Sequence, residues 1–128
     1  MILVTGAGGQ VGTELLARAA THGHDVKGLI RADLDISDAA AVQAAAARIK
    51  PSLIVNAAAY TAVDKAEEDQ DAAYTINRDG PANLAAAAKA AGIPLIHIST
   101  DYVFDGNKDG AYLESDPVAP LGIYGASK

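Results

Sequence analysis

Cysteine and tryptophan are both missing from this sequence of 128 residues. Without cysteine, disulfide bonds and thiolate-bound metal sites are excluded, and a reducing compartment fits the composition. Phenylalanine and methionine occur once each, so much of the 50% hydrophobic content is alanine. Alanine-rich stretches favour helices packed closely against a sheet, and the length suits one domain that buries a real core.

Basic residues are scarce. Ten Lys and Arg stand against sixteen Asp and Glu, which leaves a formal net charge of −6. A nucleic-acid-binding surface needs clustered Lys and Arg, so we expect no nucleic-acid partner.

Long hydrophobic runs are missing too. The apolar stretches break at Asn56, Lys89 and Gly92, and none approaches the roughly 20 residues of a membrane-spanning helix. The stretch Ile2–Val4 is too short for a signal peptide and has no basic flank. The sequence therefore predicts a cytoplasmic protein that makes no contact with a membrane.

Short aliphatic strands alternate with segments of helical spacing. We predict strands at 2–4, 25–30, 53–55 and 95–99, a brief strand segment at 34–36, and helices at 11–20, 38–49, 63–91 and from 122 onward. Gly80 and Pro81 should end, kink or restart the helix over 63–91. This alternation predicts an α/β fold, a Rossmann-like doubly wound parallel sheet of about four to five strands with helices on both faces.

A complete doubly wound dinucleotide fold has about six strands. We therefore expect residues 1–128 to form a single but truncated NAD(P)-binding domain, the N-terminal part of a longer protein. The strand at 95–99 would then be left as a hydrophobic edge, which natural proteins usually cover.

The motif TGAGGQVG, from Thr5 to Gly12, places glycines between a strand and a helix. Gly6 permits a tight turn, Gly9 lets the backbone approach a pyrophosphate, and Gly12 lets the helix lie close to the strand. The amides of Gln10 and Val11 at the helix start favour an anion. This context of strand, glycines and helix predicts dinucleotide binding.

The end of the second strand predicts the cofactor preference. Arg31 stands where a ribose-binding acid is expected, and an arginine pairs with a 2′-phosphate, which favours NADP slightly over NAD. A solvated surface arginine is the alternative. Asp35 and Ile36 could instead flank the adenine. After the third strand, the small residues Ala57, Ala58 and Ala59 would let the backbone pass close under a cofactor.

Two further segments carry candidate chemical groups. Thr100 follows the strand at 95–99 with a hydroxyl that can bind a substrate carbonyl, and Asp101 and Tyr102 come directly after it. In YGASK, Tyr124 and Lys128 are four residues apart and would share a helix face, where a nearby ammonium favours ionisation of a phenol. The histidines have no metal-binding spacing, so no metal site is predicted.

These motifs together resemble the extended short-chain dehydrogenase/reductases, and among them the dTDP-4-dehydrorhamnose reductase family. The likeness runs over the whole chain and is carried by GQVGTEL, VNAAAYTAVDKAEED, INRDGPANLA, IHISTDYVFDG and YLESDPVAPLGIYGASK. It implies reduction of dTDP-4-dehydro-L-rhamnose to dTDP-L-rhamnose with NADP or NAD, a step of surface polysaccharide biosynthesis. The family's nucleotide-sugar lobe follows the Tyr/Lys pair, so we expect residues 1–128 to bind the cofactor but to be inactive alone.

The resemblance also implies residue roles. Thr100, Tyr124 and Lys128 would be catalytic, and Thr100, Asp101 and Tyr102 would contact the dTDP-sugar. The implied cofactor-binding residues are Gly6, Gly9, Gln10, Val11, Gly12, Arg31, Asp35, Ile36, Ala57, Ala58, Ala59, Tyr60, Thr61, Tyr124 and Lys128. Glu14 matches a position that helps some members bind magnesium at a homodimer interface.

Two other functions stay open from the sequence. One is another nucleotide-sugar reductase or epimerase of the extended family, which would share the glycines and the Tyr/Lys pair. The other is a non-catalytic NADP-binding regulatory subunit, which Thr100, Tyr124 and Lys128 make less favoured.

Overall fold

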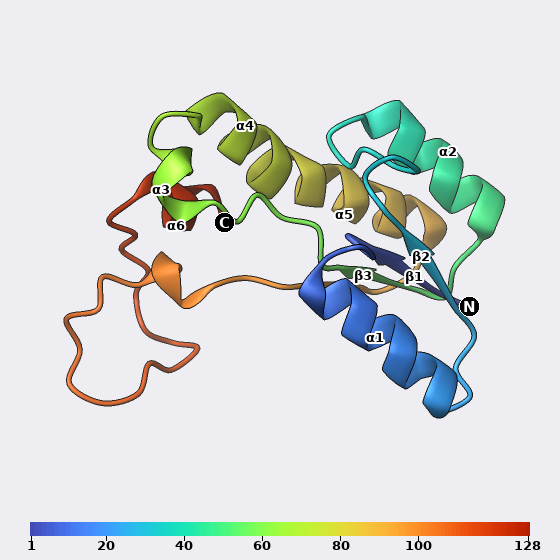
Figure 1. The fold of residues 1–128 in the computed structure, drawn as a ribbon, viewed down its shortest axis with the longest axis horizontal. Helices are drawn as coiled ribbons and strands as arrows, with labels where there is room; N and C mark the ends of the chain where they lie inside the picture. Colours follow the sequence, from blue (N-terminus) through green and yellow to red (C-terminus); the bar gives the residue numbers. More distant parts are fainter.

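A computed structural model describes residues 1–128 and contains one four-stranded parallel sheet (Figure 1). Its strands are β1 (Ile2–Thr5), β2 (Val26–Leu29), β3 (Leu53–Asn56) and β4 (Leu95–His97), in the spatial order β2-β1-β3-β4. The order reverses direction at β1 and β3, so the carboxyl ends of these two strands form a topological switch point, where doubly wound sheets bind their ligands. The predicted parallel, doubly wound fold is confirmed.

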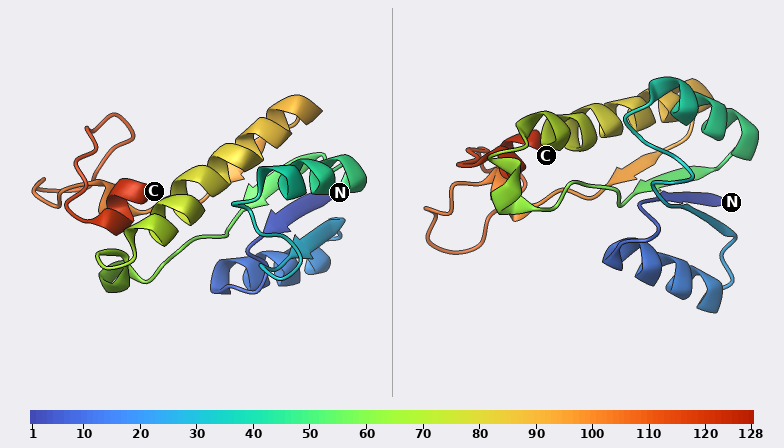
Figure 2. Two further views of the ribbon diagram at one scale, coloured as in Figure 1. Left: turned by 90° about the horizontal axis from the view of Figure 1, so that it is seen from above. Right: turned by 45° about the horizontal axis from the view of Figure 1, so that its top comes forward.

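Helices cover both faces of this sheet, as predicted. Helix α1 (Gln10–Thr21) lies on one face, and α2 (Ala39–Ile49) and α5 (Gly80–Ala91) lie side by side on the other (Figures 1 and 2). The remaining helical segments lie beyond the carboxyl ends of the strands: α3 (Val63–Ala66), α4 (Gln70–Tyr74), the π-helical turn η1 (Thr75–Asp79), the 3-10 turn η2 (Asp101–Val103) and α6 (Ile123–Ser127).

The main hydrophobic core lies between the sheet and the α2/α5 layer. Leu3, Ile54 and Leu84 are fully buried there, together with small alanines on both helices. Helix α2 begins where predicted because the Asp38 carboxylate accepts a hydrogen bond from the amide of Ala41. Helix α5 ends at Gly92, whose φ of 67° is left-handed and suits glycine.

The predicted strand segment at 34–36 is wrong. Leu34 and Ile36 are buried in the core, but their backbone runs through turns and forms no strand. The amide nitrogen of Asn83 on α5 donates to the carbonyl oxygens of Ile36 and Ser37. These carbonyl groups therefore bond to a helix and not to a neighbouring strand.

The predicted helix over 63–91 is interrupted at residues 67–69, between α3 and α4, and not at Gly80. From Gln70 to Ala91 the backbone stays helical, and only the hydrogen-bond pattern changes at the Gly80–Pro81 pair. The amide of Gly80 donates to the carbonyl of Thr75, five residues earlier, which is the hydrogen bond of a π turn. Pro81 then occupies the first turn of α5, where its missing N–H costs little.

Strand β4 is the exposed edge that the sequence predicted. It pairs only with β3. Ile96 on the strand and Ile98 just after it are 50% and 40% exposed. No helix of the structure is long and apolar enough to cross a membrane.

A buried chain of polar side chains joins the carboxyl ends of three strands. The amide oxygen of Asn56 accepts hydrogen bonds from the Thr5 hydroxyl (2.7 Å) and the Ala58 amide (3.0 Å). The side-chain amide nitrogen of Asn56 therefore faces Nδ1 of His97 at 3.0 Å. Because this nitrogen can only donate, Nδ1 must accept the hydrogen bond. The proton of the neutral imidazole thus lies on Nε2, which is buried without a partner. Burial, followed by the charge of Lys128, lowers the pKa of His97.

This lowered pKa makes the stability of the chain depend on pH. The unfolded chain binds a proton at His97 near pH 6.5, whereas the folded chain resists it until lower pH. We expect the free energy of unfolding to fall as the pH drops from about 7.5 to 5.5, by at most about 1.4 kcal/mol per pH unit. Thermal unfolding measured across this pH range should show this dependence of stability on pH. The dependence should become weaker in His97→Gln and should persist in His24→Gln. An equal slope in the parent and in His97→Gln would contradict the assignment.

Candidate functional site

The glycine loop lies between β1 and α1 and is held against the segment that follows β3. Gly6 has a left-handed φ of 71°, and a β-carbon there would lie 2.6 Å from the Ala57 carbonyl carbon. A β-carbon on Gly12 would lie 2.7 Å from Cα of Ala7. Both glycines are therefore required by backbone packing, in agreement with the turn and helix-packing roles predicted for them.

Gly9 differs from these two glycines. It is exposed at the N-cap of α1, its backbone is extended, and it gives the helix no side-chain cap. A β-carbon on Gly9 would meet only the Gly6 carbonyl oxygen, at 3.4 Å. The fold itself does not need a glycine here. Gln10 and Val11 follow in the first turn of α1, where amide groups have no partner within the helix.

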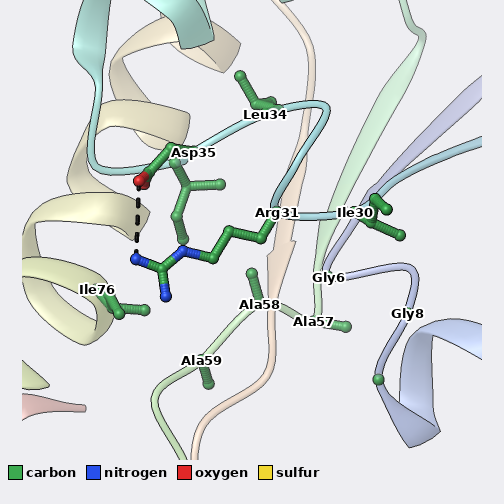
Figure 3. A pocket seen from close by; sticks show the side chains of 12 residues that line it. Gly6, Gly8, Ile30, Arg31, Leu34, Asp35, Ala57, Ala58, Ala59 and Ile76 are labelled. Carbon is green, nitrogen blue, oxygen red and sulfur yellow. Dashed lines mark ion pairs between the residues drawn. The ribbon is translucent and has the colours of Figure 1, made fainter.

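A pocket opens above this loop at the switch point of the sheet (Figure 3). Four segments line it: the glycine loop, the turn after β2, the alanine segment after β3, and η1. The lining residues are Gly6, Gly8, Gly9, Ile30, Arg31, Leu34, Asp35, Ile36, Ala57, Ala58, Ala59 and Ile76. Eight of the predicted cofactor residues are thus brought together in what we call the switch-point pocket.

Arg31 extends across the switch-point pocket toward Asp35 (Figure 3). Its guanidinium lies 4.0 Å from the Asp35 carboxylate, and the two side chains are 78% and 45% exposed. Such an exposed pair contributes little to stability. The pKa of Asp35 is lowered, mainly because its carboxylate accepts hydrogen bonds from the hydroxyl and amide of Ser37. Ser37 thus holds one oxygen of the Asp35 carboxylate, and Arg31 makes only a long contact with the other oxygen.

The segment after Ala59 is tied to η1 and α6 through one buried side chain. The Asn77 amide oxygen accepts from the Tyr60 amide at 2.8 Å, and its nitrogen donates to the Tyr60 carbonyl at 3.0 Å. The same nitrogen donates to the Ser127 hydroxyl at 3.0 Å. Tyr60 and Thr61, predicted to line the cofactor, lie outside the switch-point pocket.

The segment after β4 carries two of the three predicted substrate residues, Asp101 and Tyr102, to a second pocket. The Thr100 hydroxyl accepts from the Tyr102 amide and donates to the Asp101 carboxylate, so it caps η2. The Tyr102 and Tyr124 rings meet edge to face, with centroids 5.5 Å apart. Both rings and Asp101 border what we call the tyrosine pocket, lined by Val63, Glu67, Asp101, Tyr102, Phe104, Asp105, Gly106, Tyr112, Leu121, Gly122, Tyr124 and Gly125.

Lys128 lies at the C-terminal cap of α6, directly after Ser127. Its ammonium donates to the carbonyl of Ile98 at 2.6 Å, and burial lowers its pKa. The structure thus attaches Lys128 to the end of β4, a contact that the four-residue spacing from Tyr124 did not predict.

Some predicted residues lie apart from both pockets. Thr100, Lys128, Gln10, Val11 and Gly12 line neither the switch-point pocket nor the tyrosine pocket. Glu14, predicted to help bind magnesium in a dimer, is exposed on α1 beside Arg18. No group of three or more His, Asp or Glu side chains is placed to hold a metal ion.

Several residues near the pockets were not predicted from the sequence. Gly8, Ile30, Leu34 and Ile76 line the switch-point pocket, and Glu67 lines the tyrosine pocket. The turn composition before Asp35 was the available signal for Ile30 and Leu34. Nothing in the local sequence indicates that Ile76 and Glu67 reach the strand ends, because both are brought there by the path of the chain between β3 and β4.

Known proteins share this arrangement. The dTDP-4-dehydrorhamnose reductase of Burkholderia thailandensis is 49% identical over 99% of this chain and 42% of its own length. A crystal structure of such a reductase from Clostridium acetobutylicum matches with a TM-score of 0.95 and 45% identity, over 98% of this chain and 45% of that chain. The Bacillus anthracis reductase, crystallised in complex with NADP, has a TM-score of 0.95 and 41% identity over the same shares.

This chain therefore spans less than half the length of the relatives it resembles. The model of the RmlD substrate binding domain family matches residues 1–128, from Met1 to Lys128. The chain belongs to the RmlD substrate binding domain family.

Proposed function

We propose that these residues form the cofactor site and the proton donor of an enzyme that reduces dTDP-4-dehydro-L-rhamnose to dTDP-L-rhamnose with NADPH or NADH. The observation that carries this proposal is the switch-point pocket, where an uncapped helix start, a glycine loop and Arg31 converge at the carboxyl ends of the strands. The relatives named dTDP-4-dehydrorhamnose reductase, one of them in complex with NADP, support it.

The residues of the switch-point pocket suit a dinucleotide. Gly9 leaves the start of α1 open, so that the amides of Gln10 and Val11 can hold a diphosphate. Arg31 can exchange its weak contact with Asp35 for a 2′-phosphate, to which a guanidinium binds with two hydrogen bonds. Asp35 and Ile36 would flank the adenine, and Ala57, Ala58 and Ala59 leave room for the cofactor. When bound, the reduced nicotinamide supplies a hydride.

In the proposed reaction the residues of this chain handle the proton. The Tyr124 hydroxyl donates its proton to the C4 oxygen of the sugar as the hydride reaches C4, so that the ketone becomes an alcohol. Thr100, Asp101 and Tyr102 would bind the substrate, while Tyr60 and Thr61 would border the cofactor. Lys128 would hold the nicotinamide ribose and favour the ionised phenol, for which its ammonium must leave the Ile98 carbonyl.

For the whole protein we also propose a cytoplasmic location and a homodimer. The absence of cysteine fits a reducing compartment. Glu14 is exposed on α1, where a partner subunit or a magnesium ion could reach it. The homodimer rests on the family resemblance and not on a contact in this chain.

Replacing Gly9 with alanine tests the diphosphate site. A β-carbon is compatible with the fold at Gly9 but not at Gly12. We expect Gly9→Ala to keep the melting temperature of this chain and to weaken NADPH binding about tenfold, a loss of about 1.4 kcal/mol. Fluorescence titration and thermal unfolding measure the two quantities. Gly12→Ala should lose stability instead, and unchanged NADPH affinity in Gly9→Ala would contradict the proposed site.

Replacing Arg31 tests the cofactor preference. We expect Arg31→Ala to weaken NADPH binding about tenfold or more, because charge-assisted hydrogen bonds to the 2′-phosphate are lost, and to leave NADH binding unchanged. Calorimetric titration of this chain with NADPH and with NADH gives the ratio of the two dissociation constants. The control is Arg48→Ala, which removes an exposed arginine from α2, outside the switch-point pocket. An equal loss for both cofactors would show that Arg31 does not read the 2′-phosphate.

Replacing Tyr124 tests the chemistry. In the product of the complete reading frame, Tyr124→Phe should lower kcat for dTDP-4-dehydro-L-rhamnose by roughly 100-fold or more, because the proton donor is lost. NADPH affinity should be kept, since the ring still packs against Tyr102. Oxidation of NADPH, followed by absorbance, measures kcat, and Tyr74→Phe on α4 is the matched control. Full activity in Tyr124→Phe would exclude this tyrosine as the donor.

A further inference from the structure

Helix α6 carries Tyr124 but does not stabilise its own N-terminus. It is five residues long, and its N-cap, Gly122, provides no side-chain hydrogen bond. A helix of this length is unstable by itself because it has too few hydrogen bonds to offset nucleation. Its position therefore depends on contacts with other elements, and Figure 1 shows α6 next to α3 and α4.

Glu67 provides the missing cap from a distant part of the chain. It follows α3, and its Oε1 accepts a hydrogen bond from the Ile123 amide at 2.8 Å, across 56 positions of sequence. A carboxylate at a helix start binds free amide groups and interacts favourably with the helix dipole. A β-carbon on Gly122 would lie 2.8 Å from the same oxygen, so the glycine leaves room for this contact.

The opposite end of α6 is held as well. The Ser127 hydroxyl donates to the Tyr124 carbonyl and accepts from Asn77. In the middle of α6, a β-carbon on Gly125 would lie 2.8 Å from the Tyr102 carbonyl carbon. Tyr124 thus lies between two polar contacts: Ser127 bonds to its carbonyl from the C-terminal side, and Glu67 accepts from the amide of Ile123, the residue before it.

We propose that Glu67 is a positioning residue for Tyr124: by capping α6 from α3, it fixes the direction in which the phenol faces the tyrosine pocket. This role rests on the proposed function of Tyr124 as the proton donor. Glu67 acts through the backbone of Ile123, the residue before the tyrosine, and not on the substrate.

Direct substrate binding by Glu67 is less favoured by the charges around it. Glu67 borders the tyrosine pocket together with Asp101 and Asp105, and no Lys or Arg lines that pocket. A third carboxylate beside these two would repel the diphosphate of a nucleotide sugar, so Glu67 does not suit that part of the substrate. One oxygen of Glu67 is already engaged by the Ile123 amide.

Three variants separate positioning from other roles. Glu67→Ala removes the cap, and Glu67→Gln keeps a carbonyl oxygen that can accept from Ile123. Glu68→Ala removes the neighbouring carboxylate, whose side chain is exposed. In this 128-residue chain, we expect hydrogen exchange of the Ile123 and Ala126 amides to become about tenfold faster in Glu67→Ala. The other two variants should exchange like the parent.

Kinetics of the complete reading-frame product give the second readout. We expect Glu67→Ala to lower kcat about tenfold with little change in the KM for either substrate, and Glu67→Gln to restore most of kcat. A rise confined to the KM for the dTDP-sugar would overturn positioning in favour of direct substrate contact. An equal loss of kcat in Glu67→Gln and Glu67→Ala would overturn it in favour of a role for the charge. Unchanged exchange in Glu67→Ala would overturn the cap itself. If exchange is faster in Glu67→Ala but the parent protein does not reduce the dTDP-sugar, the proposed function is overturned and the cap stands.

Discussion

The whole arrangement depends on one close approach of backbone to backbone, where Gly6 lies against the peptide of Ala57 and Ala58. Because Gly6 has no side chain and takes a left-handed φ, the glycine loop can turn back beneath the segment that leaves β3. Any larger residue would push these two segments apart. The switch-point pocket exists because both segments leave neighbouring parallel strands at the same edge and meet there.

A second constraint aligns the strand ends with one another. Thr5, Asn56 and His97 form a buried hydrogen-bonded chain across β1, β3 and β4. An unpaired amide at Asn56 would be costly to bury. The hydrogen bonds among these three side chains therefore fix how the ends of the three strands are aligned. The segments carrying Ala57–Tyr60 and Ile98–Tyr102 leave from these fixed ends. Lys128 joins the same edge through the Ile98 carbonyl, which links α6 to the sheet.

Much of the fold could be predicted from local patterns. The four main strands, helices α1 and α2, and the roles of Gly6 and Gly12 follow from aliphatic runs, caps and glycine spacing. The prediction of a strand at 34–36 was wrong because its alternating apolar residues are buried without forming a strand. They pack in the core beside α5, where Gly80 leaves room for the Ile36 side chain. The candidate site was only partly predictable. Its pocket residues near glycines and strand ends could be named, whereas Ile76, Asn77 and Glu67 act through contacts made by α3 and η1.

The sequence by itself determined the parallel α/β architecture, the glycine loop, and the order of the chemical groups along the chain, because these depend on local periodicity and on residue type. Only the tertiary structure decided which groups meet. It placed Arg31 across the switch-point pocket, fixed the proton of His97 on Nε2 through Asn56, and attached Lys128 to Ile98. It also gave α6 a cap from Glu67. Hydrogen bonds between residues 30 to 56 positions apart have no local signature, because they form only once the strands and helices have packed.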